Sequence, residues 1–340
     1  MIYRFNNVYI KDKYSLLSST KYNPIVKDSV NKMIDDYYMN EKSIEVAESK
    51  YQELTICKLY EKYPKTNLLI SGDLQNQILS STLSASEVRL PLIGIYSACS
   101  TFVEGLIIAS EFCELSKINS IVSVSSHNLV SEKQFRFPVE YGAVRRKVNT
   151  CTASGSVSVY VTSEKSNIKI ESALIGKVYK TNHKDTNDMG SAMAIACANS
   201  INDFLRESKR KIDYYDLVLT GDLGIYGARI MKECFEKISK QKMNNLIDSG
   251  SIFYKDKKTP FAGASGPCII PFVLFDYIVP SKKYKKILVV GSGSLHSVIS
   301  SNLKLPIPSI SHVVSLEVFM WFIYYHFYIV VLYVVYLNTF

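Results

Sequence analysis

The strongest constraint on the fold is a pattern that the sequence contains twice in the same order. An apolar run followed by Gly-Asp-Leu occurs at residues 68–74 and again at 217–223. Farther along each half, the apolar segment 121–127 has a counterpart at 287–292. Unbroken apolar strands that are bounded by Gly or Ser and alternate with helical segments are typical of parallel strands buried on both faces of a sheet. Two such sets in one order predict an α/β layered fold built from two matching halves.

The chain of 340 residues is long enough for two such halves, and its composition is that of a folded protein. Hydrophobic residues make up 47% and charged residues 21%. The net charge of +9 favours anionic partners such as an acidic membrane surface or a small polyanion. Apart from short runs at 208–211 and 282–286 the basic residues are scattered, and no nucleic-acid-binding motif accompanies them. We therefore expect solvated basic faces and no nucleic-acid partner.

The cysteines indicate a reducing compartment. All seven stand far apart, and none belongs to a Cys-x-x-Cys pair. This spacing and the odd count argue against a zinc site and against a disulfide scaffold. Residues 1–15 mix charged and polar side chains, so they do not have the apolar core of a secretory signal.

The segment 318–337 differs in kind from the rest of the chain. It is an apolar and aromatic run in which His326 is the only titratable group apart from tyrosines. A run of about 20 apolar residues is enough for a helix to cross the hydrocarbon core of a bilayer, whereas the Tyr, Val and Ile content also fits a pair of buried strands. Three interpretations stay open: a membrane-associated tail, an ordinary buried segment and a non-native extension.

A turn and a helix are predicted between the two halves. Residues 184–190 have the composition of a turn, and the helical pattern covers 191–208. An Asn or Asp directly before such a pattern usually caps the helix, and we expect that structural role here.

Residues 90–113 contain the most informative local pattern, a short apolar strand followed by Cys99 and an amphipathic helix. Cys99 is expected at the strand-to-helix turn, where the unpaired N–H groups and the positive dipole end of the helix lower the pKa of a thiol and attract anions. That position suits a nucleophilic cysteine, and it also suits a carboxylate ligand that undergoes no chemistry. A third interpretation is an inert buried thiol, the commonest state of cysteine. The residues alone leave all three open.

The residues around Cys99 also carry a family resemblance. The string 94–101, followed by Glu104 and Gly105, resembles the active-cysteine turn of the thiolase and ketoacyl-synthase superfamily and, more narrowly, the SpoVAD family. The resemblance covers roughly residues 40 to 317. Further strings that resemble the family, in order, are 72–78, 125–128, 134–138 with 140–142, 185–190 and 311–315.

The resemblance implies a fold: a duplicated, five-layered αβαβα structure of the thiolase type with an additional apolar C-terminal tail. The implied parts are an N-terminal half at 1–170 that carries Cys99, a C-terminal half at 171–317, and the tail at 318–340.

The resemblance also implies a function. SpoVAD proteins are similar in fold to condensing enzymes but are understood as binders of dipicolinic acid, which usually occurs with calcium. They act with the other SpoVA membrane proteins in moving this solute during sporulation and germination. The implied location is the cytoplasmic, core-facing side of the inner spore membrane, with peripheral membrane association. The resemblance implies no other cofactor, and a homodimer is the default for such folds.

Site residues follow from the resemblance and from the chemistry of the ligand. Dipicolinate is a planar dianion, which helix N-termini, an arginine fork and hydroxyl donors would recognise. The implied ligand-binding residues are Cys99, Ser100 and Thr101 at the helix start, His127 after the next strand, Arg136, and Asp73, Asn76 and Gln77 near the same cleft or across the interface of the halves. Other roles stay open for three of them: a surface ion pair for Arg136, a satisfied buried histidine for His127, and a turn or cap residue for Asp73.

The catalytic set of a working thiolase is incomplete in this sequence. Such an enzyme needs an activated cysteine, a histidine base, usually a second cysteine or histidine, and an oxyanion hole. The loop 263–268 stands where thiolases carry a Gly-His-Pro loop and has no histidine, and 291–294 stands where they carry a Cys-x-Gly loop and has no cysteine. His296 lies close to the second loop and is a candidate substitute for the missing base. We therefore expect no enzyme activity, with acyl transfer through Cys99 as the alternative.

Overall fold

The structure is a computed structural model of the chain, and it describes residues 1–20, 22–135, 146–255 and 262–319. Its centre is a mixed sheet with the strand order β12-β11-β14-β17-β9-β2-β8-β6-β4-β5. Two further strands, β1 (Tyr3–Arg4) and β3 (Lys32–Ile34), pair with β9 and β2.

Both halves of this sheet have the same internal order. The first half contains β2 (Tyr9–Ser18), β4 (Leu68–Gly72), β5 (Leu92–Gly94), β6 (Ser120–Ser126) and β8 (Gly155–Thr162). The second half contains β9 (Ile168–Leu174), β11 (Leu217–Thr220), β12 (Leu246–Asp248), β14 (Lys286–Val290) and β17 (Val313–Val318). When the five strands of each half are numbered in sequence order, their order in the sheet from the outer edge to the centre is 3-2-4-5-1 in both halves. The strands of the two predicted repeats, β4 with β11 and β6 with β14, hold equivalent places, which confirms the duplication.

The strands that the sequence predicts to be parallel are parallel. β4 pairs in parallel with β5 and β6, and β11 pairs in parallel with β12 and β14. The other neighbours in the strand order, such as β6 with β8 and β14 with β17, are antiparallel, and the short β3 is parallel to β2. The apolar pattern does not reveal this difference, because β8 is buried along its whole length just as a central parallel strand would be.

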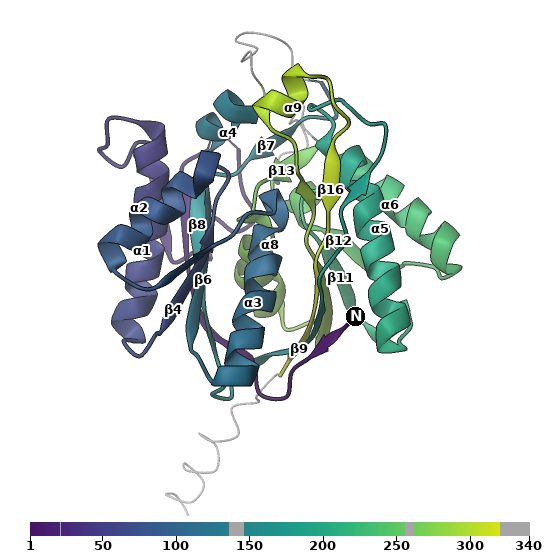
Figure 1. Cartoon of the computed structure of the whole chain (residues 1–340), viewed down its shortest axis with the longest axis horizontal. Helices are drawn as coiled ribbons and strands as arrows, with labels where there is room; N and C mark the ends of the chain where they lie inside the picture. Colours follow the sequence, from purple (N-terminus) through teal and green to yellow (C-terminus); the bar gives the residue numbers. More distant parts are fainter. Residues whose placement is uncertain (21, 136–145, 256–261, 320–340) are drawn as a thin grey trace, which may run out of the picture.

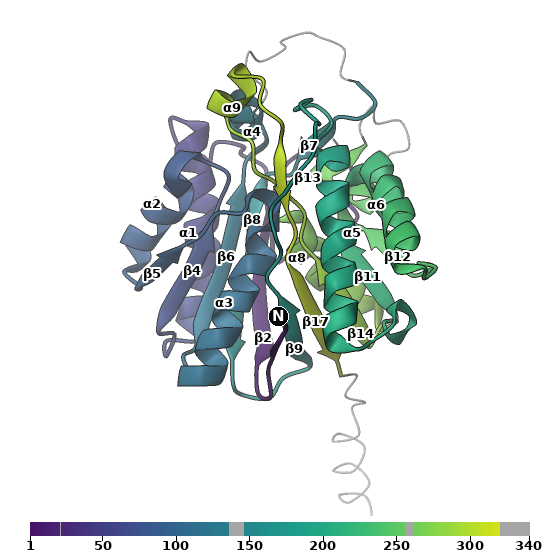
Figure 2. The same ribbon diagram turned by 45° about the vertical axis from the view of Figure 1, so that its right-hand side comes forward.

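Helices cover the sheet in the predicted five-layered arrangement (Figures 1 and 2). The outer layers are α1 and α2 on the first half and α5 and α6 on the second, and α3 and α8 lie between the halves. The helix bounds are α1 (Ile44–Lys62), α2 (Leu79–Val88), α3 (Thr101–Ser116), α4 (Asn128–Phe135), α5 (Met189–Ser208), α6 (Gly224–Ser239), α7 (Ser249–Ile252), α8 (Ile269–Val273) and α9 (Val298–Asn302). The short strands outside the main sheet are β7 (Thr150–Thr152), β10 (Tyr179–Lys180), β13 (Gly263–Ser265), β15 (Gly293–Ser294) and β16 (Pro308–Ile310).

Three clusters of buried side chains hold these layers together. The central cluster joins the inner faces of both sheet halves to α3 and α8, and one further cluster lies under each pair of outer helices. The alternation along β11 shows how the sequence supplies two cores: Leu217 and Leu219 belong to the central cluster, and Val218 to the outer one.

The halves form one continuous sheet. β2 and β9 pair at Tyr9 and Ile10, and the predicted division between residues 170 and 171 falls inside β9. The helix predicted over 191–208 begins two residues earlier, and Asp188 caps it by accepting a hydrogen bond from Ser191 N (3.2 Å). Of the predicted tail, residues 320–340 lie outside the described residues.

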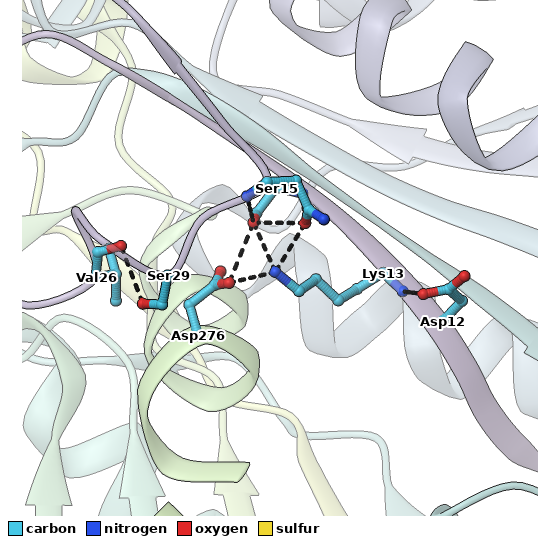
Figure 3. A network of polar contacts seen from close by, with 7 residues as sticks. Asp12, Lys13, Ser15, Val26, Ser29 and Asp276 are labelled. Atoms are coloured by element: carbon cyan, nitrogen blue, oxygen red, sulfur yellow. Dashed lines mark hydrogen bonds and ion pairs between the residues drawn. The ribbon is translucent and has the colours of Figure 1, made fainter. Parts of the chain in front are cut away.

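A buried polar contact also joins the halves (Figure 3). Lys13 on β2 forms an ion pair with Asp276, which lies in the helical turn Leu274–Ile278 that continues α8. Lys13 Nζ also donates hydrogen bonds to Ser15 Oγ (2.9 Å) and Asn31 Oδ1 (2.8 Å). The Asp276 side chain is fully buried, and within the described part of the chain its Oδ2 has no hydrogen-bond partner. Lys13 is therefore the charge that compensates this carboxylate.

Candidate functional site around Cys99

Cys99 lies at the junction between β5 and α3, where the sequence predicts it. β5 ends at Gly94, a short helical turn spans Ala98–Ser100, and α3 begins at Thr101. Ala98 has a φ of 52°, which is costly for a residue with a Cβ atom, so the chain is held in a sharp turn here. Cys99 emerges from this turn with 9% of its surface exposed.

The thiol borders a small cavity between the two halves, with a volume of about 20 Å³. A buried water needs nearly that much space. The second half lines it with Ser265 at the end of β13, Ser294 at the end of β15, and His296, whose Nδ1 lies 2.9 Å from Ser294 Oγ. The two loops in which the sequence lacks thiolase groups thus present hydroxyls to the cavity of Cys99. Its other described lining residues are Leu74, Ala98, Ser131, Phe135, Thr152 and Met189.

Burial and the neighbouring side chain of Asp222 set the electrostatics of Cys99. Asp222 belongs to the second Gly-Asp-Leu string and accepts hydrogen bonds from Gly266 N (3.0 Å) and Ser292 Oγ (2.7 Å). Burial, followed by the negative charge of Asp222, raises the pKa of the Cys99 thiol well above its ordinary value. The sequence predicts a helix terminus that lowers this pKa, but desolvation and a neighbouring carboxylate both disfavour the thiolate. The thiol therefore stays protonated.

A wider groove of about 400 Å³ adjoins the Cys99 cavity, and Phe135 and His296 line both. The centroids of these two rings are 5.3 Å apart, so the rings form the boundary between cavity and groove. Asn76 and Gln77, both predicted ligand contacts, are exposed in its wall. The volume is within the range of small-molecule sites. The remaining described walls are Gln75, Ile78, residues 94–96, Gln134, Leu295, Ser297 and Val298.

Asp73 is occupied by contacts within its own half. Its carboxylate accepts hydrogen bonds from Gln75 N (2.8 Å), Ser81 N (2.8 Å) and Ser81 Oγ (2.7 Å). These contacts close the turn after β4 and hold the start of α2, which is the turn and cap role that the sequence leaves open. Asp73 is fully buried and does not line the cavity or the groove.

Ser100 and Thr101 also face the protein interior. Thr101 Oγ1 donates to Ala98 O (2.5 Å) and accepts from Ser97 N (3.1 Å), so it stabilises the turn before α3. Ser100 packs against the second half, since a Cβ atom at Gly291 would lie 2.2 Å from its Oγ. Of the three residues predicted at the helix start, Cys99 is the one that borders the cavity.

His127 is a buried histidine with both ring nitrogens in contact with the backbone. Its Nε2 lies 3.2 Å from Tyr37 O, and its Nδ1 accepts from Leu129 N (3.2 Å). The ring lies between Tyr37 and Tyr51, at centroid distances of 4.3 and 5.9 Å. Burial lowers the pKa of His127 to about 4, so the ring is neutral at physiological pH. These contacts match the structural role that the sequence leaves open.

Arg136 lies outside the described residues, so its role stays a prediction. It directly follows Phe135, the ring at the boundary of the groove.

A third cavity, of about 230 Å³, lies between the end of β2, the start of α4 and the end of α7. Tyr22, Tyr37 and Tyr254 line it together with serine and threonine side chains, Asn128 and Cys151. Its described lining contains no Lys or Arg side chain, and the same is true of the described lining of the groove.

Several residues at the site were not predicted as ligand contacts. Phe135 and Met189 belong to strings that resemble the SpoVAD family, so the sequence drew attention to their segments but not to their side chains. Thr152 and Ser131 carry no local signal. They reach the cavity through β7 and α4, whose positions depend on contacts between distant segments.

All seven cysteines are free thiols. Among residues 1–20, 22–135, 146–255 and 262–319, no helix combines the length and apolar character that crossing a bilayer requires. In the same part of the chain, no cluster of three or more His, Cys, Asp or Glu side chains could hold a metal ion.

Comparison with known proteins identifies the family. The sequence model of stage V sporulation protein AD (SpoVAD) matches residues 3–317, a range that begins well before the resemblance noted from the motifs. Stage V sporulation protein AD of Bacillus subtilis (strain 168) is 33% identical over 296 residues, which cover 84% of this chain and 87% of that protein.

Solved structures of condensing enzymes share the fold. 3-Oxoacyl-[acyl-carrier-protein] synthase III from Aquifex aeolicus VF5 superposes with a TM-score of 0.58 at 14% identity, over 91% of this chain and 99% of the enzyme. Cerulenin-bound OleA from Xanthomonas campestris gives a TM-score of 0.57 at 14% identity, over 92% of this chain and 100% of that chain. These similarities confirm the predicted thiolase-like fold, and the sequence matches show that the chain belongs to the SpoVAD family of sporulation proteins.

Proposed function

We propose that the chain is a non-catalytic dipicolinate-binding component of the spore inner-membrane SpoVA complex. It would serve dipicolinate uptake in sporulation and release in germination, on the core-facing side of the membrane. Membership of the SpoVAD family supports the sporulation role. The dipicolinate-binding role is what the family resemblance implies, and the cavity and groove beside Cys99 support a binding site there.

The observation that carries the proposal is the composition of the Cys99 cavity. Serine hydroxyls, Ser265 and Ser294, occupy the two loops where a thiolase places catalytic groups, and burial together with Asp222 keeps the thiol protonated. Acyl transfer needs a thiolate and space for a thioester, and the cavity of about 20 Å³ offers little more than room for one water. A condensing-enzyme fold with these features is better suited to binding than to chemistry.

We place the ligand in the groove of about 400 Å³. The cavity of about 20 Å³ is too small for a pyridine ring with two carboxylates, whereas the groove of about 400 Å³ has ample volume. Asn76 and Gln77 supply amide donors from its wall, and Tyr96, which is 42% exposed, lines it with a phenol. The aromatic side chains of Phe135 and Tyr96 offer faces for a planar ring.

The test is calorimetric titration of dipicolinate, with and without calcium, into the wild-type chain and three variants. We expect saturable binding that weakens at least tenfold in an Asn76→Ala/Gln77→Ala variant and in Arg136→Ala. The matched control is Tyr37→Phe, which removes a hydroxyl from the tyrosine-lined cavity and should bind as the wild type does. Absence of saturable binding in the wild type would refute the proposal. Loss of binding in the control alone would move the site to the other cavity.

One observation favours the alternative, a condensing enzyme that acts through Cys99: His296 lines the same cavity as the thiol. An imidazole there is a candidate for a general base. Incubation with acetyl-CoA followed by peptide mass spectrometry tests it. Acylation of Cys99 that is lost in His296→Ala would establish the enzyme, and an unmodified Cys99 supports the binding protein.

A further inference from the structure

The α9 tip, which we define as residues 297–305, is an exposed apolar knob at one end of the molecule. In Figures 1 and 2 α9 stands beyond the end of the sheet, at the end opposite to that where β17 finishes. Ile299, Leu303 and Leu305 are 73%, 65% and 49% exposed. Isolated exposed aliphatic residues are common, but three on one turn and the loop that follows it form a protruding apolar surface.

The knob is held in place by its own hydrogen bonds. Ser297 and Ser300 form a reciprocal capping box: Ser297 Oγ accepts from Ser300 N (3.1 Å), and Ser300 Oγ accepts from Ser297 N (2.8 Å). At the other end Leu303 N donates to Ile299 O (3.0 Å) and Leu305 N donates to Ser300 O (3.0 Å). The three aliphatic side chains are therefore presented to solvent by a defined turn.

The two chain segments that form the knob and lie beside it carry lysines and no carboxylate. Residues 286–316 contain no Asp or Glu, and neither do residues 172–184, which lie beside them. The two segments are joined by the pairing of β10 with β16 and by a hydrogen bond from Ile307 N to His183 O (2.8 Å). Lys304 on the knob is exposed, as are Lys180 and Lys184 on the neighbouring segment.

The nearest carboxylate along that segment is already paired. Asp185 accepts two hydrogen bonds from Arg146 Nη2, at 2.7 and 2.8 Å. The knob thus combines protruding aliphatic side chains with exposed lysines. The two segments that carry these lysines, 286–316 and 172–184, contain no Asp or Glu. This combination binds anionic bilayers, because the side chains enter the headgroup region while the lysines attract the lipid charge.

We propose that the α9 tip docks the protein on an anionic lipid surface. A protein partner would bury a broad area of about 800 Å² on each side, whereas this knob is small and convex. Ser297 and Val298 also line the groove beside Cys99, so docking through the tip would bring the groove to the membrane surface. The proposal rests on the knob itself and holds whether or not the groove binds dipicolinate.

The test measures vesicle binding of the full chain by flotation, without dipicolinate. The probes are vesicles of phosphatidylcholine with one third phosphatidylglycerol and vesicles of phosphatidylcholine alone. We expect preference for the anionic vesicles, at least a tenfold loss of affinity in Ile299→Ser/Leu303→Ser, and about a fivefold loss in Lys304→Gln. The matched control is Leu115→Ser, since Leu115 is 78% exposed at the end of α3, away from the tip.

Hydrogen–deuterium exchange locates the contact independently. Anionic vesicles should protect peptides that cover 297–305 and leave those around Leu115 unchanged. Equal binding by all variants would assign membrane attachment to another segment, such as residues 320–340, and would overturn the proposal. Protection of the tip that rises with protein concentration in the absence of lipid would assign it to a second copy of the chain and overturn it as well.

Discussion

Replacement of Lys13 by methionine should destabilise the protein strongly, because it leaves the Asp276 carboxylate buried without a compensating charge. The Asp276 side chain is fully buried, that of Lys13 is 21% exposed, and their ion pair joins β2 to the central helices (Figure 3). Removal of one partner of such a pair costs roughly 3 to 5 kcal/mol, because the other charge loses its compensation. We therefore expect the free energy of unfolding of Lys13→Met to fall by an amount in that range.

The dependence on pH provides a sharper check. Burial raises the pKa of the Asp276 carboxyl, and Lys13 acts against this increase. Without Lys13 the folded-state pKa rises further above the unfolded one. A carboxyl with a raised folded-state pKa contributes stability at pH values below its unfolded pKa, and this contribution is lost as the pH rises through the folded pKa. The deficit of Lys13→Met should therefore be smaller at pH 5 than at pH 8.

Urea unfolding followed by circular dichroism measures both effects. Lys58→Met is the control, since Lys58 forms an exposed ion pair with Glu61 and should matter little. A Lys13→Met/Asp276→Leu double variant should recover much of the loss, because it removes both charges. If Lys13→Met unfolds at the same urea concentration as Lys58→Met, the ion pair does not stabilise the junction of the halves and the reasoning is wrong.

Three further predictions follow from the site. Cys99 should react slowly with iodoacetamide at pH 8, as followed by peptide mass spectrometry. Asp222→Asn should speed the reaction, because it removes a negative charge that raises the pKa of the thiol. Equal rates in the wild type and the variant would show that Asp222 does not raise this pKa. The pKa of His127 is lowered to about 4 in the folded protein, against an ordinary 6.5, so the unfolded state binds the proton first as the pH falls. The free energy of unfolding should therefore decrease between pH 6.5 and pH 4, and it should decrease less in His127→Asn. A urea midpoint that does not change with pH would contradict this. Gly291→Ala should lower the free energy of unfolding by roughly 1 to 3 kcal/mol, because the new Cβ atom crowds Ser100 Oγ. Adding Ser100→Ala should recover part of this loss. If it recovers none, Ser100 does not pack against this loop.

The sequence predicted the fold well because the decisive pattern was local and repeated. The apolar strings that became β4, β6, β11 and β14 needed no knowledge of distant contacts, and duplication fixed their places in the sheet. The antiparallel pairing of β8 could not be predicted, because a strand buried on both faces has the same composition whether it runs parallel or antiparallel to its neighbours.

The candidate site was less predictable because it is assembled from both halves. Cys99 was located correctly from its strand-to-helix pattern, but its chemistry depends on Asp222, which is remote in sequence. His127 and Thr101 were singled out from the family resemblance and the chemistry of the ligand, and the structure uses their side chains for contacts with the nearby backbone. Local patterns predict where a polar group lies, and the packing of distant segments decides which of its neighbours it meets.

The two Gly-Asp-Leu strings show how a duplicated fold acquires an asymmetric site. In the first half Asp73 closes the turn that follows its own strand. In the second half Asp248 takes over that task by accepting from Leu223 N (3.1 Å) and Gly224 N (3.0 Å). Asp222 is thereby left to bind the loops at Gly266 and Ser292 and to act on Cys99.

Under the proposed function, two features of the site account for the absence of catalysis. The loops 263–268 and 291–294 offer serines at the cavity, and burial together with the repeated aspartate disfavours the thiolate. Restoring a histidine alone, as in Ser265→His, should therefore not activate Cys99, because the carboxylate still opposes the thiolate. Activation would require the removal of the Asp222 charge as well.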